Sequence, residues 1–193
     1  MQAKKMAQKA IELDEFLNIG HLLLADIYLI ERNYDDALVE YEKAVELNPN
    51  FSNAHFLYAR CLFFSGQKEK ALIPNKTAAL LDPHHNWGVP LLNGKIYYHT
   101  GSYEEALTEF EKVKTKCEMG ECTMFYPHLY FAMVYGETGR DKKARFHMEK
   151  ALEINPRFNL ETRRKTQLHK NKEDTERENE GLRKAGAPEH PPS

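Results

Sequence analysis

The side chains of this chain best suited to metal chemistry lie close together near residue 120. Cys117, Cys122 and His128 form a C-x4-C-x5-H pattern. Thiolates and imidazoles are ligands that zinc prefers, but structural zinc sites use four ligands at tight spacing. A fourth ligand is missing from the pattern, so we expect no metal here. We expect instead an exposed loop with incidental thiols, with a labile disulfide as the alternative.

A second group of side chains suited to chemistry surrounds one predicted turn. His84, His85, Trp87 and, further along, His99 would line a small-ligand site or an enzyme active site if they converged. This is the alternative to a polar turn between two structural units. The sequence lacks the catalytic signatures G-x-x-x-x-G-K-[ST], G-x-S-x-G and H-E-x-x-H. We therefore expect no enzyme activity and no cofactor.

Adjacent carboxylates occur at Asp35-Asp36 and at Glu104-Glu105. Both pairs stand at the starts of predicted helices, where acidic side chains meet the positive end of the helix dipole. Their structural role accounts for them, so they are not candidates for acid–base catalysis.

Composition excludes several other classes of protein. The 193 residues carry a net charge of −2, with 29% charged and 41% hydrophobic residues. A nucleic-acid-binding domain is usually basic, so we expect no nucleic-acid partner. The chain lacks an apolar run of the ~20 residues that span a bilayer, and its first residues lack the apolar core of a signal peptide. Three cysteines at irregular spacing make no disulfide framework, so we expect a reducing, cytoplasmic location.

The elements that position these residues repeat along the chain. An alanine recurs at steps of 34, 34, 35 and 38 residues, and the apolar positions around it follow a helical period. The alanines are Ala3, Ala37, Ala71, Ala106 and Ala144. Gly66, Gly101 and Gly139 hold one place in three units, where a first helix ends. Asn33, beside that place in another unit, is the usual substitute.

Each unit therefore contains two amphipathic helices that pack closely. Small residues on the first helix let the pair approach, and prolines end the second helix. The small residues are Ala25, Ala59, Gly94 and Ala132, and the prolines are Pro49, Pro83 and Pro156. Pro74 lies inside one second helix, where it is either drift in a tolerant array or a hinge or binding notch.

This small–large–small order with a closing proline resembles the tetratricopeptide repeat. The resemblance implies an all-α, right-handed solenoid of antiparallel helix pairs. The predicted organisation is a half repeat at 1–17, four units at 18–51, 52–85, 87–120 and 125–158, a charged and partly helical extension at 159–185, and a disordered tail at 186–193. Because the half repeat supplies only a second helix, we expect the chain to be cut from a longer protein.

In such arrays the first helices line a concave groove that binds a protein or peptide segment through apolar side chains. Phe63 and Phe64 are adjacent on a helix, so both are hard to bury behind one stripe, and we expect an exposed aromatic patch there. Arg60 and Lys95 would set the polarity of the bound segment. The lysine and asparagine clamp of chaperone-binding repeats is absent. The candidate groove residues are Asp26, Ile30, Phe56, Arg60, Phe63, Phe64, Lys95, Tyr98, His99, Tyr126 and Met133.

The extension after the last repeat has a split charge. Residues 161–172 carry a net charge of +4 and residues 173–180 a net charge of −4, which favours a self-paired or helical segment. The segment resembles the end of the repeat region of bacterial class III adenylate/guanylate cyclases. The matching phrases are NPRFNLE at 155–161, DTER at 174–177, GLRKAG at 181–186 and Pro188. The resemblance implies an accessory region of a multidomain signalling protein, without cyclase activity.

Four residues of the extension depart from that family. Thr175, Glu178 and Asn179 stand where the family is apolar, and Ala187 replaces a leucine. A helix at 172–184 would then have little besides Leu182 to dock with, so we expect it to fray. An alternative function follows, in which the unpaired first helix and the frayed tail complete each other between chains of a homo-oligomer.

Overall fold

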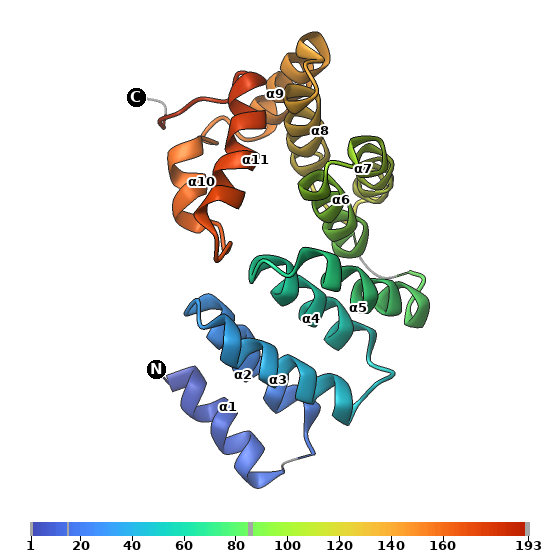
Figure 1. Cartoon of the computed structure of the whole chain (residues 1–193), viewed down its shortest axis with the longest axis vertical. Helices are drawn as coiled ribbons and strands as arrows, with labels where there is room; N and C mark the ends of the chain where they lie inside the picture. Colours follow the sequence, from blue (N-terminus) through green and yellow to red (C-terminus); the bar gives the residue numbers. More distant parts are fainter. Residues whose placement is uncertain (1, 15, 85–86, 192–193) are drawn as a thin grey trace. The chain divides into compact units, whose positions relative to one another are not determined.

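The computed structural model describes residues 2–14, 16–84 and 87–191, and these fold into α-helices (Figure 1). The chain divides into two compact units, unit 1 at Met1–His85 and unit 2 at Asn86–Ser193. Unit 1 contains α1 (Gln2–Leu13), α2 (Asn18–Ile30), α3 (Tyr34–Leu47), α4 (Ser52–Phe64) and α5 (Lys68–Leu81). Unit 2 contains α6 (Gly88–Thr100), α7 (Tyr103–Glu118), α8 (Phe125–Glu137), α9 (Asp141–Ile154), α10 (Leu160–Thr166) and α11 (Lys172–Lys184).

The helices pack as antiparallel pairs within each unit, as the sequence predicts. α2 pairs with α3 and α4 with α5 in unit 1, whereas α6 pairs with α7 and α8 with α9 in unit 2. We call α2, α4, α6 and α8 the first helices of their pairs. α1 packs on α2, as α3 packs on the first helix of the next pair, α4.

The small residues work as their place in the repeat predicts. Ala25, Ala59 and Ala132 are fully buried. Gly94 lies against the ring of Phe110 on α7, and a Cβ at that position would come within 2.3 Å of the ring. Phe110 stacks in turn on Tyr130 of α8, with ring centroids 5.0 Å apart. This close approach lets aromatic rings form the core of unit 2.

The turn inside each pair uses the left-handed backbone conformation. Gly66, Gly101 and Gly139 have φ values of 94°, 84° and 68°. In the pair α2–α3 the residue with positive φ is Arg32, at 62°, and Asn33 has φ −89°. The prediction that Asn33 substitutes for glycine is therefore wrong: the turn keeps its length, and the strain falls on Arg32.

The helix of the third repeat that contains Pro74 is continuous. α5 remains helical through Pro74, whose side chain is buried. The residue that follows, Asn75, is fully buried at the place that Tyr41 and Phe110 hold in sister repeats. The backbone therefore accommodates the proline without ending the helix.

Candidate functional site: the inner faces of the first helices

The candidate site is the face of the first helices that carries the predicted groove residues, which we call the inner face. On α2 it includes Ile19, Leu23, Asp26 and Ile30, whose spacing of i, i+4, i+7 and i+11 places them on one side of a helix. On α4 the corresponding residue to Asp26 is Arg60, and on α6 it is Lys95. The exposure of the inner face differs between the two units.

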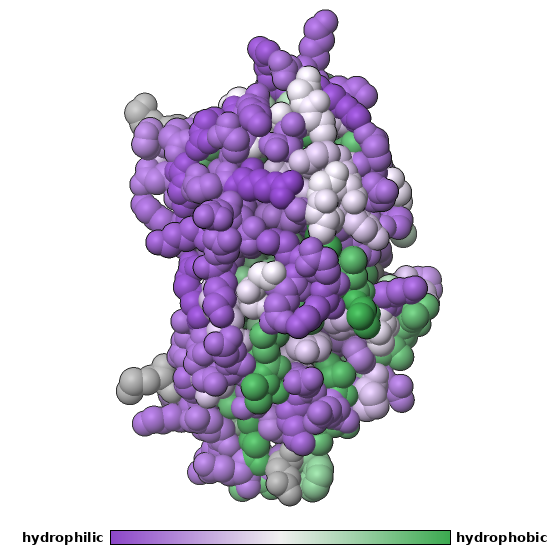
Figure 2. Space-filling model, viewed as in Figure 1, coloured by the Kyte–Doolittle hydropathy of each residue, from purple (hydrophilic) through white to green (hydrophobic). Residues whose placement is uncertain are grey.

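In unit 1 the inner face of α2 is exposed and apolar. Ile19 is 43% exposed, Leu23 53% and Ile30 72%. Figure 2 shows hydrophobic atoms on the visible face of this unit, between polar ones. A row of exposed aliphatic side chains of this kind is typical of a contact surface.

A polar pair lies beside this apolar row. The Arg60 guanidinium donates a hydrogen bond to Asp26 Oδ1 at 2.7 Å, which joins α4 to α2. The hydroxyl of the buried Tyr41 on α3 donates to the same oxygen at 2.5 Å. Burial and the neighbouring Asp26 carboxylate raise the pKa of Tyr41 well above its ordinary value, so its hydroxyl stays a donor. Asp26 therefore neutralises Arg60 within unit 1.

The sequence predicts that Phe63 and Phe64 form an exposed aromatic patch on α4, and this prediction is wrong for Phe63. Phe63 is fully buried, and its ring packs edge-on against Phe64 with centroids 5.4 Å apart. Its place in the repeat is that of Leu29, which is also buried. Position 63 belongs to the core between repeats, whereas Phe64 and Phe56 are half-buried.

In unit 2 the inner face is covered by α11. The guanidinium of Arg177 donates to the carbonyl oxygens of His99 and Tyr98, at 2.7 and 3.3 Å, at the end of α6. The Tyr98 hydroxyl donates back to the carbonyl oxygen of Arg177 at 3.0 Å. On α8, a Cβ at Gly136 would lie 2.1 Å from the carbonyl oxygen of Gly181, so the two helices touch through their backbones.

The carboxylate of Glu178 is the centre of the contact between α11 and α6. Glu178 is fully buried, and its Oε1 lies 3.3 Å from Lys95 Nζ, 3.0 Å from His99 Nε2 and 3.3 Å from His169 Nε2. Arg163 of α10 donates to its Oε2 and also donates to Asn179 at 2.6 Å. Burial alone would raise the pKa of Glu178, but Lys95, Arg163 and the two histidines hold it well below the ordinary value.

Three of these groups have the spacing of metal ligands. His99, His169 and Glu178 place one donor atom each within 4.8 Å of one another. Both carboxylate oxygens already accept from cations, however, because Lys95 lies at Oε1 and Arg163 at Oε2. A divalent cation would have to enter beside two positive charges, so the donor set fits an ion network better than a metal site.

These contacts overturn two expectations about the extension. The predicted fraying of the helix at 172–184 is wrong, because Glu178 and Asn179 dock through charge and hydrogen bonds instead of apolar contact. The predicted disorder from 186 onward is also wrong for residues 186–191. Pro188 and Glu189 accept backbone hydrogen bonds from Leu160 and Glu161 at 3.0 Å each. Residues 192–193 lie outside the described part of the chain.

The sequence did contain a signal for this docking. The predicted pairing between the basic and acidic halves of the extension is confirmed by Arg163–Glu178 and by Arg164–Glu176, the latter at 2.6 Å. The frayed tail that the homo-oligomer hypothesis requires is thus absent from the described residues, because α11 is bound within its own unit.

The candidate groove residues of unit 2 therefore divide into two groups. Lys95, Tyr98, His99 and Met133 are buried, the first three in contact with α11 and Met133 beside Gly181. They lie on the predicted face, but they are not open to a partner, which corrects that part of the prediction. Tyr126 instead lines a pocket beside α10.

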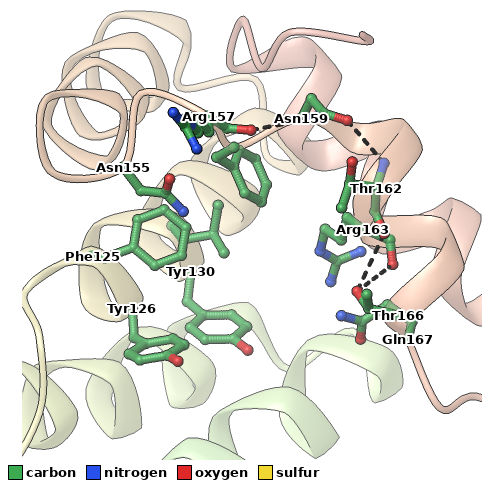
Figure 3. Close-up of a pocket in the computed structure, with 12 residues that line it drawn as sticks. Phe125, Tyr126, Tyr130, Asn155, Arg157, Asn159, Thr162, Arg163, Thr166 and Gln167 are labelled. Carbon is green, nitrogen blue, oxygen red and sulfur yellow. Dashed lines mark hydrogen bonds between the residues drawn. The ribbon is translucent and has the colours of Figure 1, made fainter. Parts of the chain in front are cut away.

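The pocket that Tyr126 lines lies at the start of α8. This pocket, of about 280 Å³, lies between α8, the segment 155–159 and α10 (Figure 3). Phe125, Tyr126 and Tyr130 form its aromatic side, and Thr162 and Arg163 face them from α10. Its lining contains no carboxylate among the described residues, so it favours a neutral or anionic group.

The residues near position 120 do not converge on a metal site. Cys117 and Cys122 form a disulfide bond at the end of α7, and Cys117 is buried. The alternative of a disulfide is thus the one observed, and the expectation of incidental thiols is wrong. His128 instead meets His147 of α9, with their Nδ1 atoms 2.9 Å apart. Burial, His128 and nearby lysines lower the pKa of His147 to about 4.

The histidines around the predicted turn have separate partners. His99 binds Glu178, and Trp87 stacks on Tyr126 with ring centroids 4.9 Å apart. His84 is exposed, and its backbone N–H donates to Asp82. His85 lies outside the described residues. No convergent small-ligand site is formed by the described members of this group.

The fold and the inner faces define an α-helical repeat protein built from antiparallel helix pairs. A family model described as anaphase-promoting complex, cyclosome, subunit 3 matches residues 31–113, and the tetratricopeptide repeat model matches residues 131–158. The chain thus contains repeats of the tetratricopeptide type. Among the described helices, we find none with the length and apolar character to cross a membrane.

Known proteins are similar to this chain in sequence and fold. Anaphase-promoting complex subunit 3 of Schizosaccharomyces pombe is 29% identical over 114 residues, which are 59% of this chain and 16% of that protein. The chain thus spans about a sixth of that relative. The structure of PilW, a type IV pilus biogenesis factor, matches with a TM-score of 0.73 and 15% identity over 95% of this chain and 81% of PilW. YrrB, a repeat protein with an unusual peptide-binding site, matches with a TM-score of 0.65 and 19% identity, over 95% of this chain and 92% of YrrB. These two likenesses show the fold.

Proposed function

We propose that the protein is a non-catalytic interaction module that binds a peptide or protein segment on the inner face of unit 1. The observation that carries this proposal is the exposed row Ile19, Leu23 and Ile30 on α2. Because these three aliphatic side chains lie on one face of the helix, they form a contiguous exposed apolar patch, which is typical of a contact site.

The polar pair beside the row supports a defined orientation of the bound segment. Asp26 and Arg60 stand side by side with about a third of each side chain exposed. Together they present an acceptor and a donor next to the apolar row. A bound segment would bury apolar side chains against Leu23 and Ile30 and place its own polar groups at this pair.

Similarity supports binding over catalysis. Tetratricopeptide scaffolds are generally non-catalytic, and YrrB, which shares the fold of this chain, has a peptide-binding site. The ionisable cluster of unit 2 is closed by α11, so its histidines and carboxylate are not offered to a substrate.

The proposal is tested by selecting peptides from a random display library on the full chain and measuring their affinity by fluorescence anisotropy. Leu23→Glu and Ile30→Glu place a charge in the apolar row, and we expect each to weaken binding at least tenfold. Val39→Glu is the matched control, because Val39 is 63% exposed but lies on α3. Unchanged affinity in both α2 variants, with helical circular dichroism retained, would refute the site.

We also propose a context for the module. The phrases at 155–161 and 181–186 resemble the repeat region of bacterial class III nucleotide cyclases, which supports an accessory role in a multidomain signalling protein. A cyclase domain in the same reading frame as this chain would support the context, and an unrelated neighbouring domain would contradict it.

A further inference from the structure

α11 occupies the inner face of unit 2, the face on which the repeat predicts a bound segment. It contacts both first helices of the unit: Arg177 and Glu178 reach α6, and Gly181 meets Gly136 of α8. The inner face of unit 1 has no such occupant among the described residues. The contacts of α11 thus reveal what the inner face of unit 2 recognises.

Each contact selects one residue type of the bound helix. A carboxylate at 178 is needed because it meets Lys95 Nζ and His99 Nε2, at 3.3 and 3.0 Å. Glycine is needed at 181 because a Cβ there would lie 2.6 Å from the Met133 carbonyl oxygen. Leu182 is fully buried, and the Arg177 guanidinium binds the last carbonyls of α6. The recognised order is Arg-Glu-x-x-Gly-Leu.

The docking face of α11 is unusual because it is mostly polar. Its buried residues are Asp174, Thr175, Glu178, Asn179, Gly181 and Leu182. Leu182 is the one large apolar side chain in this set. A helix of this kind exposes little apolar surface when it leaves its groove, because most of the groups that it buries are polar and can be hydrated in water. A helix held by an apolar stripe would not have this property.

We propose that the inner face of unit 2 is a second binding site, for a partner helix with the order Arg-Glu-x-x-Gly-Leu, and that α11 competes for it from within the chain. The partner's carboxylate pairs with Lys95 and His99, and its glycine lies on Gly136. This site is distinct from the apolar row on α2 and does not depend on it.

The test uses a fluorescent peptide of residues 170–187 and the full chain. Glu178→Gln weakens the hold on α11, so we expect this chain to bind the peptide at least tenfold more tightly than the wild-type chain does. Glu180→Gln is the matched control, because Glu180 is an exposed residue of the same helix and pairs with Arg183 within α11. A peptide carrying Gly181→Val should bind neither chain.

Leu23→Glu should leave peptide binding unchanged, which separates failure of this proposal from failure of the proposed function. Equal binding by the Glu178→Gln and wild-type chains, or equal binding of the Gly181→Val peptide, would overturn the proposal. If Glu178→Gln does not fold, hydrogen exchange of the wild-type chain decides. Amides of 172–184 should exchange faster than those of 125–137, and equal rates would overturn the proposal.

Discussion

Arg60 and Lys95 hold the same place in two successive repeats, one residue after a small residue and six before a glycine turn. In unit 1 the counter-ion of Arg60 is Asp26, from the preceding first helix. In unit 2 the counter-ion of Lys95 is Glu178, from the extension. In unit 1 the charge of Arg60 is therefore neutralised while the inner face stays open. In unit 2 the charge of the buried Lys95 is neutralised by α11. The inner face is open in unit 1 because the carboxylate comes from a neighbouring first helix. It is closed in unit 2 because the carboxylate comes from α11.

Removal of the Glu178 carboxylate should produce the largest difference between the units, measured as a loss in the free energy of unfolding. Glu178→Ala leaves Lys95 and Arg163 buried without it, and loss of one partner of a buried ion pair costs about 3–5 kcal/mol. Asp26→Asn affects a pair that is about one-third exposed, so we expect a loss of at most about 1 kcal/mol. Urea unfolding measures both values. Similar losses for the two variants would show that the units do not differ in this way.

The backbone contact between α8 and α11 gives the next effect. Gly136→Ala places a Cβ 2.1 Å from the Gly181 carbonyl oxygen, so α11 must move away from α8. We expect a loss of about 1–3 kcal/mol, as for overpacking a core, together with faster hydrogen exchange in residues 172–184. Because Gly181→Ala disturbs the same contact, the double variant should lose less than the sum of the two single losses. Full additivity would mean that the glycines do not act together.

Acid should weaken unit 2 through His147. Its pKa in the folded state, about 4, is below the value of 6.5 expected in the unfolded chain. Folding therefore favours the neutral ring, and this stabilisation is complete above pH 6.5 and is lost as the pH falls toward 4. Allowing for solvent screening of a half-buried group, we expect about 1–2 kcal/mol. Thermal unfolding from pH 7 to 4 should be less pH-dependent in His147→Gln; an unchanged slope would contradict this assignment.

The smallest effect concerns the turn of unit 1. Arg32 has φ 62°, where the sister repeats have glycine. Arg32→Gly should raise the free energy of unfolding by about 0.5–1 kcal/mol, because relief of the left-handed strain exceeds the entropy lost by glycine. Asn33→Gly is the control and should give no gain, since Asn33 has φ −89°. Denaturant titration distinguishes the two, and an equal gain in both would exclude the strain explanation.

Much of this comparison was predictable from the sequence. The alanine period and the glycines at 66, 101 and 139 predict the helix pairs and their turns, because local packing and backbone geometry dictate those residue types. The period also predicts that Lys95, Tyr98 and His99 share one side of their helix, and α11 contacts all three. Their occupant was missed because Glu178 is polar, and a polar residue on a docking face argues against burial unless its partners are known. Lys95 precedes it by 83 residues, so only the fold brings that partner near.

Hydrogen exchange of the full wild-type chain, with and without a peptide selected on it from a random library, compares the two faces in one sample. An open face on unit 1 and a closed face on unit 2 predict slower exchange in residues 18–30 when the peptide binds, with residues 172–184 unchanged. Exchange in residues 18–30 that stays unchanged at a saturating concentration of the peptide would contradict that assignment of the faces.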